Sequence, residues 1–153
     1  MIIRELMTVY PVCIGINADM RRAAEIISIA EVSDVMVVDD KRHFVGVLSE
    51  GDLLRALLPD FEEVLKAGGT LSAAFSFFVD KGSRLASRSI EPLVITECIT
   101  VAPTDQAAWA ATIMVRKQIR RLPVVNETGF LVGTVSRGDI CRAVLYNAEA
   151  AYE

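Results

Sequence analysis

The sequence predicts a mixed α/β (α+β) fold in which two copies of one βαββα unit pack together, with a helical insert between them. Three observations lead to this prediction. A twelve-residue stretch recurs 87 positions further along the chain with seven identical residues, where about one match is expected by chance. Short apolar runs with strand-like alternation are interleaved with segments of helical periodicity. The connection between the copies is far longer than an ordinary loop.

The recurring stretch covers residues 45–56 and 132–143, which share Val, Gly, Ser, Gly, Asp, Arg and Ala at matching places. The same offset, without a gap, also places Val37 and Val38 on Val124 and Val125. The chain is therefore a duplicated unit. It divides into a first repeat (1–58), a linker (59–91) and a second repeat with a short tail (92–153).

In the first repeat, residues 12–16 are expected to form a short strand. A helix follows behind Asn17 or Asp19 as its N-cap, and its predicted inward stripe is Met20, Ala23, Ala24 and Ile27. The pattern then predicts a buried strand over 35–38, a polar turn over 39–43 and a returning strand over 44–48. Ser49 is expected to cap a last helix that ends near residue 58.

The second repeat has the same order of elements. Thr104 is the expected helix cap, and the predicted inward stripe is Ala107, Ala110, Ala111 and Met114. Strands are expected over 122–125 and 130–135, joined by a turn at Gly129, and a helix follows Ser136. Because neither half has enough strands to close a core alone, we expect the pair to be the folding unit.

The linker is expected to contain two helices, over residues 61–65 and from 71 to about 79, separated by Gly68 and Gly69. Leu71, Phe75 and Phe78 share one face of the second helix. The linker contains four phenylalanines, and so many large apolar side chains are rarely left in water. We therefore expect the linker to pack onto the repeats or onto a partner.

The composition excludes several classes of protein. The hydrophobic content of 52% is high for 153 residues and favours a subunit interface, so a homodimer is expected. The net charge of −4 has interspersed signs and gives no basic field for nucleic acid. The longest apolar run is too short for membrane insertion, and the first residues lack the order of a signal peptide. Three cysteines without CxxC spacing indicate a reducing, cytoplasmic setting and no metal site.

Both repeats end their last strand with Gly-h-h-Ser-x-Gly-Asp, where h is apolar or Thr, and then enter a helix. Such a junction presents backbone N–H groups and the positive end of a helix dipole to an anion. The Ser hydroxyl can donate to a phosphate or ribose oxygen, and the Asp can accept from ribose hydroxyls. The alternative is a capping box, in which the two side chains only satisfy their own helix. The two roles are compatible, and the retention of Ser, Gly and Asp in both copies favours a ligand.

These motifs resemble a tandem pair of cystathionine-β-synthase (CBS) domains, over about 6–58 and 92–145. The resemblance rests on residues 121–125 and 131–140 and their weaker counterpart over 35–53. It implies a regulatory module that senses an adenine nucleotide (AMP, ADP or ATP) in the cleft between the repeats. It also implies that Ser136 with Asp139, and Ser49 with Asp52, meet ribose and phosphate.

The sequence predicts two sites of unequal strength. The stronger, second-repeat site would comprise Arg120, Arg121, Leu122, Pro123, Ser136, Arg137 and Asp139; the weaker, first-repeat site would comprise Asp34, Val35, Met36, Ser49 and Asp52. The difference is electrostatic. Guanidinium groups suit bidentate phosphate contacts, whereas Asp34 and Glu50 at the matching places repel an anion. The alternative for Arg120 and Arg121 is a solvated helix end, where basic residues favour the dipole.

Other distinctive residues carry weaker signals. His43 is the only histidine and is expected to face solvent. Cys13, Cys98 and Cys141 are expected to be small apolar fillers. Trp109 lies off the inward stripe of its helix and favours an interface over the core.

The leading hypothesis is a stand-alone regulatory CBS pair that binds a nucleotide and signals to an effector protein that the sequence does not identify. The alternative is a structural or interaction module with empty or degenerate sites. The sequence has no glycine-rich phosphate loop, nucleophile elbow, metal-ligand pair or histidine-based acid–base set. We therefore predict no enzymatic activity, no catalytic residues, no required cofactor, and no binding of metal, membrane or nucleic acid.

Overall fold

The computed structural model describes residues 1–66 and 68–150, with side chains to residue 147. The first repeat contains β1 (Cys13–Gly15), α1 (Met20–Ala30), β2 (Asp34–Val38), β3 (Phe44–Ser49) and α2 (Glu50–Leu57). The insert contains α3 (Phe61–Lys66) and α4 (Leu71–Leu85), and the second repeat contains α5 (Ala107–Arg116), β4 (Arg121–Val125), β5 (Leu131–Ser136) and α6 (Arg137–Ala150). The mixed fold and its two repeats are as the sequence predicted. No helix of the described part is long and apolar enough to cross a membrane.

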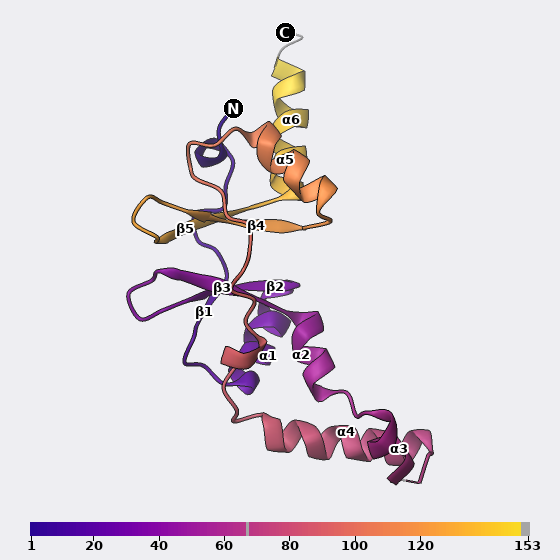
Figure 1. Ribbon diagram of the computed structural model, residues 1–153. Coiled ribbons are helices and arrows are strands. Elements are labelled where there is room, and N and C mark those ends of the chain that lie inside the picture. Colours follow the sequence, from indigo (N-terminus) through magenta and orange to yellow (C-terminus); the bar gives the residue numbers. More distant parts are fainter. Residues whose placement is uncertain (67, 151–153) are drawn as a thin grey trace.

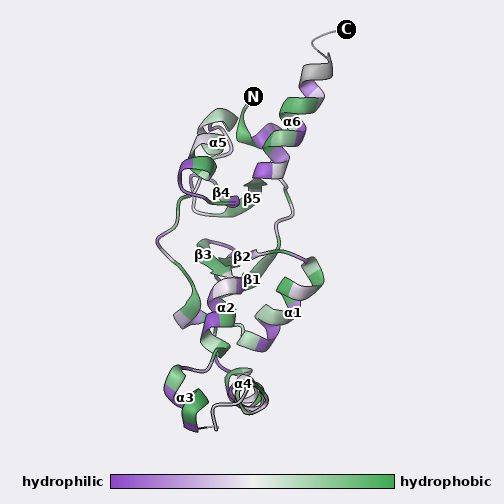
Figure 2. Ribbon diagram, turned by 90° about the vertical axis from the view of Figure 1, so that its right-hand side faces the viewer, coloured by the Kyte–Doolittle hydropathy of each residue, from purple (hydrophilic) through white to green (hydrophobic). Residues whose placement is uncertain are grey.

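The two sheets lie face to face in the middle of the molecule (Figure 1). Strand β2 pairs in parallel with β1 and antiparallel with β3, and β4 pairs antiparallel with β5. The counterpart of β1 in the second repeat is reduced to a single parallel bridge between Val101 and Val124. Helices α5 and α6 cover the outside of one sheet, α1 and α2 cover the other, and the insert lies beyond α2 (Figures 1 and 2).

Each repeat has its own apolar core, which a distant segment completes. Ile3 and Leu6 are buried with α5, β4 and β5 of the second repeat, whereas Ile90 is buried with the first. A small cluster of Met36, Val38 and Leu131 joins the sheets. The expectation that neither half closes a core alone is therefore correct only in part, since each repeat has a core of its own that includes a segment from elsewhere in the chain. Each stripe packs on its own sheet, and the exchanged segments make the halves interdependent.

Helix caps explain most of the element boundaries. Asp19 caps α1, its carboxylate accepting from the N–H of Arg22 at 2.8 Å. Thr104, however, does not cap α5: the helix begins after Gln106, which makes no side-chain cap bond. Gln106 occupies the position that matches Asp19, so the capping side chain has been lost in the second copy. Of the predicted stripes, Ala24 is exposed, and the other members are buried or half-buried.

The insert is helical, as predicted, and of the two possibilities for its Phe side chains, the repeats or a partner, the chain itself covers only part of them. Phe75 is 69% exposed and does not dock on the chain's own surface, whereas Phe78 is half-buried. Helix α4 packs against α2 and α3, and Lys81 of α4 donates to the carbonyl of Leu58 at 2.8 Å and pairs with Glu63. This packing leaves Leu71, Phe75 and Val79 on the outside of the helix.

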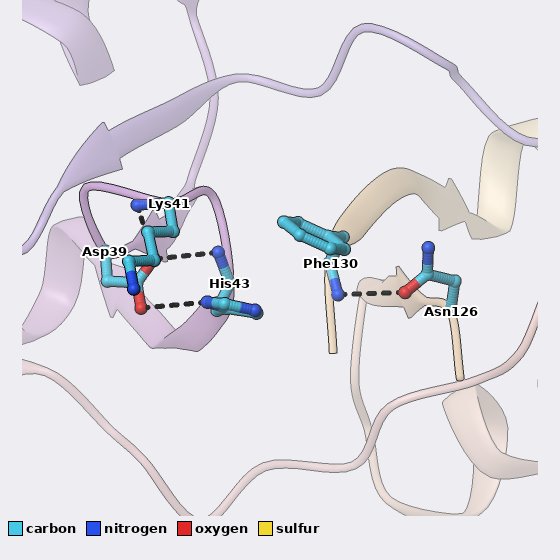
Figure 3. Close-up of polar contacts among 5 residues, drawn as sticks. All are labelled: Asp39, Lys41, His43, Asn126 and Phe130. Carbon is cyan, nitrogen blue, oxygen red and sulfur yellow. Dashed lines mark hydrogen bonds and ion pairs between the residues drawn. The ribbon is translucent and has the colours of Figure 1, made fainter. Parts of the chain in front are cut away.

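The turns that end the two hairpins meet at one edge of the sheet interface (Figure 3). Asp39 accepts from the backbone N–H groups of Lys41 and His43, each at 2.9 Å, and Asn126 accepts from that of Phe130 at 2.9 Å. The His43 ring stacks on Phe130 with centroids 4.5 Å apart. His43 is therefore half-buried between the repeats, which corrects the expectation that it simply faces solvent.

Candidate functional site

A cleft of about 430 Å³ opens between the repeats, at the end of the sheets where strands meet helices. One wall comes from the start of β2 and from the junction between β3 and α2. The other wall comes from residues 118–123, which lead into β4 and form its first half. The lining includes the predicted residues Asp34, Ser49, Arg120, Arg121, Leu122 and Pro123. It also includes residues that the sequence reasoning missed, namely Val47, Gly51, Arg55, Ile95, Cys98, Ile99, Gln118 and Ile119.

The structure groups the predicted residues differently from the sequence. Arg120 and Arg121 of the second repeat lie in one cleft with Ser49 of the first, so the cleft combines residues of both predicted sites. Val35 and Met36, from the first-repeat group, are buried in the core. Ser136, Arg137, Asp139 and Asp52 are not among the residues that line this cleft in the described chain.

In both Ser-x-x-Asp motifs the Ser caps its helix, and the second motif is a full capping box, because the backbone N–H of Ser136 also donates to Asp139 Oδ2 at 2.8 Å. Ser49 Oγ accepts from the N–H of Asp52 at 3.0 Å and donates to its Oδ2 at 2.7 Å. Ser136 makes the same two contacts with Asp139 at 3.1 and 2.7 Å. In this arrangement the Ser hydroxyl at the junction is already held in place, and a ligand would compete with the Asp for it. The Asp52 carboxylate also pairs with Arg55 of the cleft wall.

Arg137 has a structural role that the sequence did not reveal. Its Nε and Nη2 donate to the carbonyls of Ile119 and Met114, each at 2.9 Å. These carbonyls lie at and beyond the C-terminal end of α5, where a cation also stabilises the helix dipole. The Arg137 guanidinium is therefore engaged with the backbone, while Arg121 makes one contact, from Nη1 to Thr134 Oγ1 at 3.2 Å.

The cleft contains both signs of charge. Among the residues the structure describes, Asp34, Glu50, Arg120 and Arg121 form no ion pair with one another. Asp34 is half-buried and accepts from Ser33 Oγ at 3.0 Å. The apolar part of the wall, from Val47, Ile95, Ile99 and Leu122, is suited to a flat ring. The site can thus hold a ring at one end and an anionic group beside the arginines.

The three cysteines are free. Cys13 and Cys98 are half-buried, in keeping with a filler role, but Cys141 is exposed, so that expectation is wrong for it. Burial raises the pKa of the Cys98 thiol, so it is mainly protonated near neutral pH. Within residues 1–66 and 68–150, no group of three metal-ligating side chains is found.

Comparison with known proteins agrees with this architecture. The family model for the CBS domain matches residues 3–59 and 88–146. An uncharacterized protein of Methanocaldococcus jannaschii is 23% identical over 155 residues, covering 95% of this chain and 92% of that protein. The CBS domain-containing protein CBSX2 of Arabidopsis thaliana is 27% identical, but the chain spans only 54% of its length.

Solved structures share the fold. The crystal structure of CBSX2 in complex with AMP has a TM-score of 0.74 and 26% identity, covering 96% of this chain and 98% of that chain. The CBS domain pair of protein MJ0100, in complex with 5′-methylthioadenosine and S-adenosyl-L-methionine, has a TM-score of 0.68 at 18% identity, covering 97% of this chain and 98% of that one.

Proposed function

The chain belongs to the CBS domain family, and we propose that it is a regulatory module that binds an adenine nucleotide in the cleft between its repeats. The observation that carries the proposal is the composition of this cleft, which is lined by two arginines of one repeat, by the serine of the motif in the other, and by apolar side chains. The AMP complex of CBSX2, at 26% identity over nearly the whole chain, supports a nucleotide as the ligand class.

In the proposed mode, the base lies against the apolar wall and the phosphate lies between Arg121 and Ser49. Charge-assisted hydrogen bonds from a guanidinium to phosphate are the strongest polar contacts the cleft can offer. The Asp52 carboxylate, which does not line the cleft in the present structure, would have to leave Ser49 and Arg55 in order to accept from the ribose hydroxyls. Binding would therefore exchange these internal contacts for contacts to the ligand.

This mode makes the first-repeat motif part of the main site, although the sequence favoured the second. The reason is that Arg120 and Arg121 enter the cleft from the second repeat, whereas Arg55 of the first repeat is already paired with Asp52. The Ser136 and Asp139 motif remains a second candidate position, related to the first by the repeat.

Calorimetric titration with AMP tests this assignment. Asp52→Ala should abolish most of the binding, whereas Asp139→Ala, a matched change in the other repeat, should leave it nearly unchanged. Arg121→Ala should weaken AMP about tenfold or more and spare adenosine, because one charge-assisted contact contributes about 1.5–3 kcal/mol. The opposite ranking of the two Asp variants would show that the second-repeat motif is the site.

The alternative function is a structural or interaction module without a ligand. Because a ligand that binds only the folded state raises the melting temperature, a thermal-shift screen separates the two functions. The screen should include AMP, ADP, ATP, NAD and S-adenosylmethionine at millimolar concentration. A shift with at least one adenylate supports the proposal, and no shift with any of them supports the structural module.

We further propose that the module acts as a homodimer and passes ligand occupancy to another protein in the cytoplasm, without enzymatic activity of its own. Exposed apolar residues on the outer helices of both repeats support an interface: Ile29, Leu54, Trp109 and Val115. Trp109 is 58% exposed, and an indole at the surface is typical of interface centres.

A further inference from the structure

Glu50 occupies the boundary between the cleft and a second hollow. The cleft continues into a groove of about 700 Å³ along α1 and α2, and only Ser33, Glu50 and Arg120 line both cavities in the described part of the chain. A ligand tail that leaves the cleft in this direction must pass Glu50 and Arg120, which line both hollows.

The backbone places Glu50 at this point. Its N–H donates to the carbonyl of Ser33 at 2.9 Å, and Asp34 is paired with Ser49 in the strand ladder. The two acidic residues therefore start from one corner of the cleft, whose lining also includes Arg120 and Arg121. The second repeat has Arg121 and Arg137 at the matching positions, so the acidic corner is a property of the first repeat alone.

The groove beyond this corner does not suit a polyanion. Its lining is mostly apolar, with Glu31 as a further acid and Arg120 as its one cation among the described residues. A single phosphate can be held by Arg121 inside the cleft. A second and third phosphate would extend toward Glu50 and Glu31 and would gain repulsion with each added charge.

We propose that Glu50 determines specificity by making the cleft select against adenine nucleotides with polyphosphate tails. This inference rests on the proposed nucleotide-binding function. The ligands that remain acceptable carry one phosphate, or a tail that is uncharged or cationic.

The experiment compares the dissociation constants of AMP and ATP for the wild-type chain, Glu50→Gln and Glu25→Gln. Glu25 lies on α1, pairs with Arg22 outside the cleft and provides the same change of net charge. Calorimetry is done with a chelator present, so that no divalent cation screens the phosphates, and at fixed low salt, where charge effects are largest. Thermal unfolding of each variant checks that it is folded.

We expect the wild-type chain to bind AMP more tightly than ATP. Glu50→Gln removes one carboxylate and should raise ATP affinity about twofold to fivefold, which is the size of one exposed charge–charge interaction. It should change AMP affinity by less than twofold. Glu25→Gln should leave both affinities unchanged. Binding of AMP with the same AMP-to-ATP ratio in all three proteins would overturn this inference alone. No binding of any adenylate to the wild-type chain would overturn the proposed function and this inference together.

Discussion

Replacement of Gly46 by Ala should destabilise the protein strongly, because Val94 and Ile95, at the start of the second repeat, lie directly against this residue. A Cβ at position 46 would lie 2.3 Å from the carbonyl oxygen of Ile95 and 2.8 Å from Cγ1 of Val94. Both are closer than any relaxed contact. The neighbouring Val47 exchanges two backbone hydrogen bonds with Ile95, at 2.9 and 3.0 Å, so the segment cannot move away without straining them.

The expected magnitude follows from these contacts. Overpacking costs about 1–3 kcal/mol, and each weakened hydrogen bond adds about 0.5–1.5 kcal/mol. With both hydrogen bonds weakened, the total of about 2–6 kcal/mol corresponds to a fall in melting temperature of roughly 5–25 °C for a domain of this size. Differential scanning fluorimetry or urea titration measures the change.

Gly15→Ala is the matched control, since a Cβ there meets nothing within 4 Å. It should change the stability by less than about 0.5 kcal/mol. Gly133→Ala repeats the test in the second copy, where the added Cβ would lie 2.7 Å from the carbonyl oxygen of Thr8. Equal melting temperatures for Gly46→Ala and Gly15→Ala would refute the reasoning.

Three further predictions concern charge and assembly. Arg137→Ala should lower the free energy of unfolding by about 1–3 kcal/mol and change AMP affinity little, because the guanidinium binds carbonyls at the end of α5. A large loss of AMP affinity with unchanged stability would contradict this role. Desolvation raises the pKa of Asp39, but hydrogen bonds from the backbone of His43 and Lys41 and from the His43 ring outweigh it and hold that pKa below its ordinary value of 3.8. The ionised Asp39 therefore stabilises the folded protein above about pH 4, and this stabilisation is lost as the pH falls further. Asp39→Asn keeps a hydrogen-bond acceptor, as Asn126 does in the other turn, and should reduce the fall in melting temperature at acid pH. The same dependence of melting temperature on pH below about 4 in the variant and the wild type would count against this. Sedimentation should give twice the mass of one chain at micromolar concentration, and Trp109→Glu should shift the distribution toward the monomer, whereas a monomeric wild-type chain would exclude the dimer.

The sequence by itself determined the duplication, the order of the elements and most of the caps. These features depend on residues that are near one another in the chain. Asp19 and Ser49 cap helices because a short polar side chain three residues ahead of a backbone N–H reaches it in almost any fold. The same holds for Ser136 and Asp139, whose spacing is that of one helical turn. The CBS resemblance follows from the same local motifs.

Tertiary structure alone decided which distant residues share a site. Arg120 and Arg121 belong to the second repeat in the sequence, yet the face-to-face packing of the sheets puts them opposite Ser49 of the first. Arg137 was expected to bind phosphate, but the end of α5 lies within its reach and offers two carbonyls. The exchange of Ile3 and Ile90 between the two cores is equally long-range. Apolar burial is not directional, so a hydrophobic pattern shows which residues are buried and not which distant segment buries them.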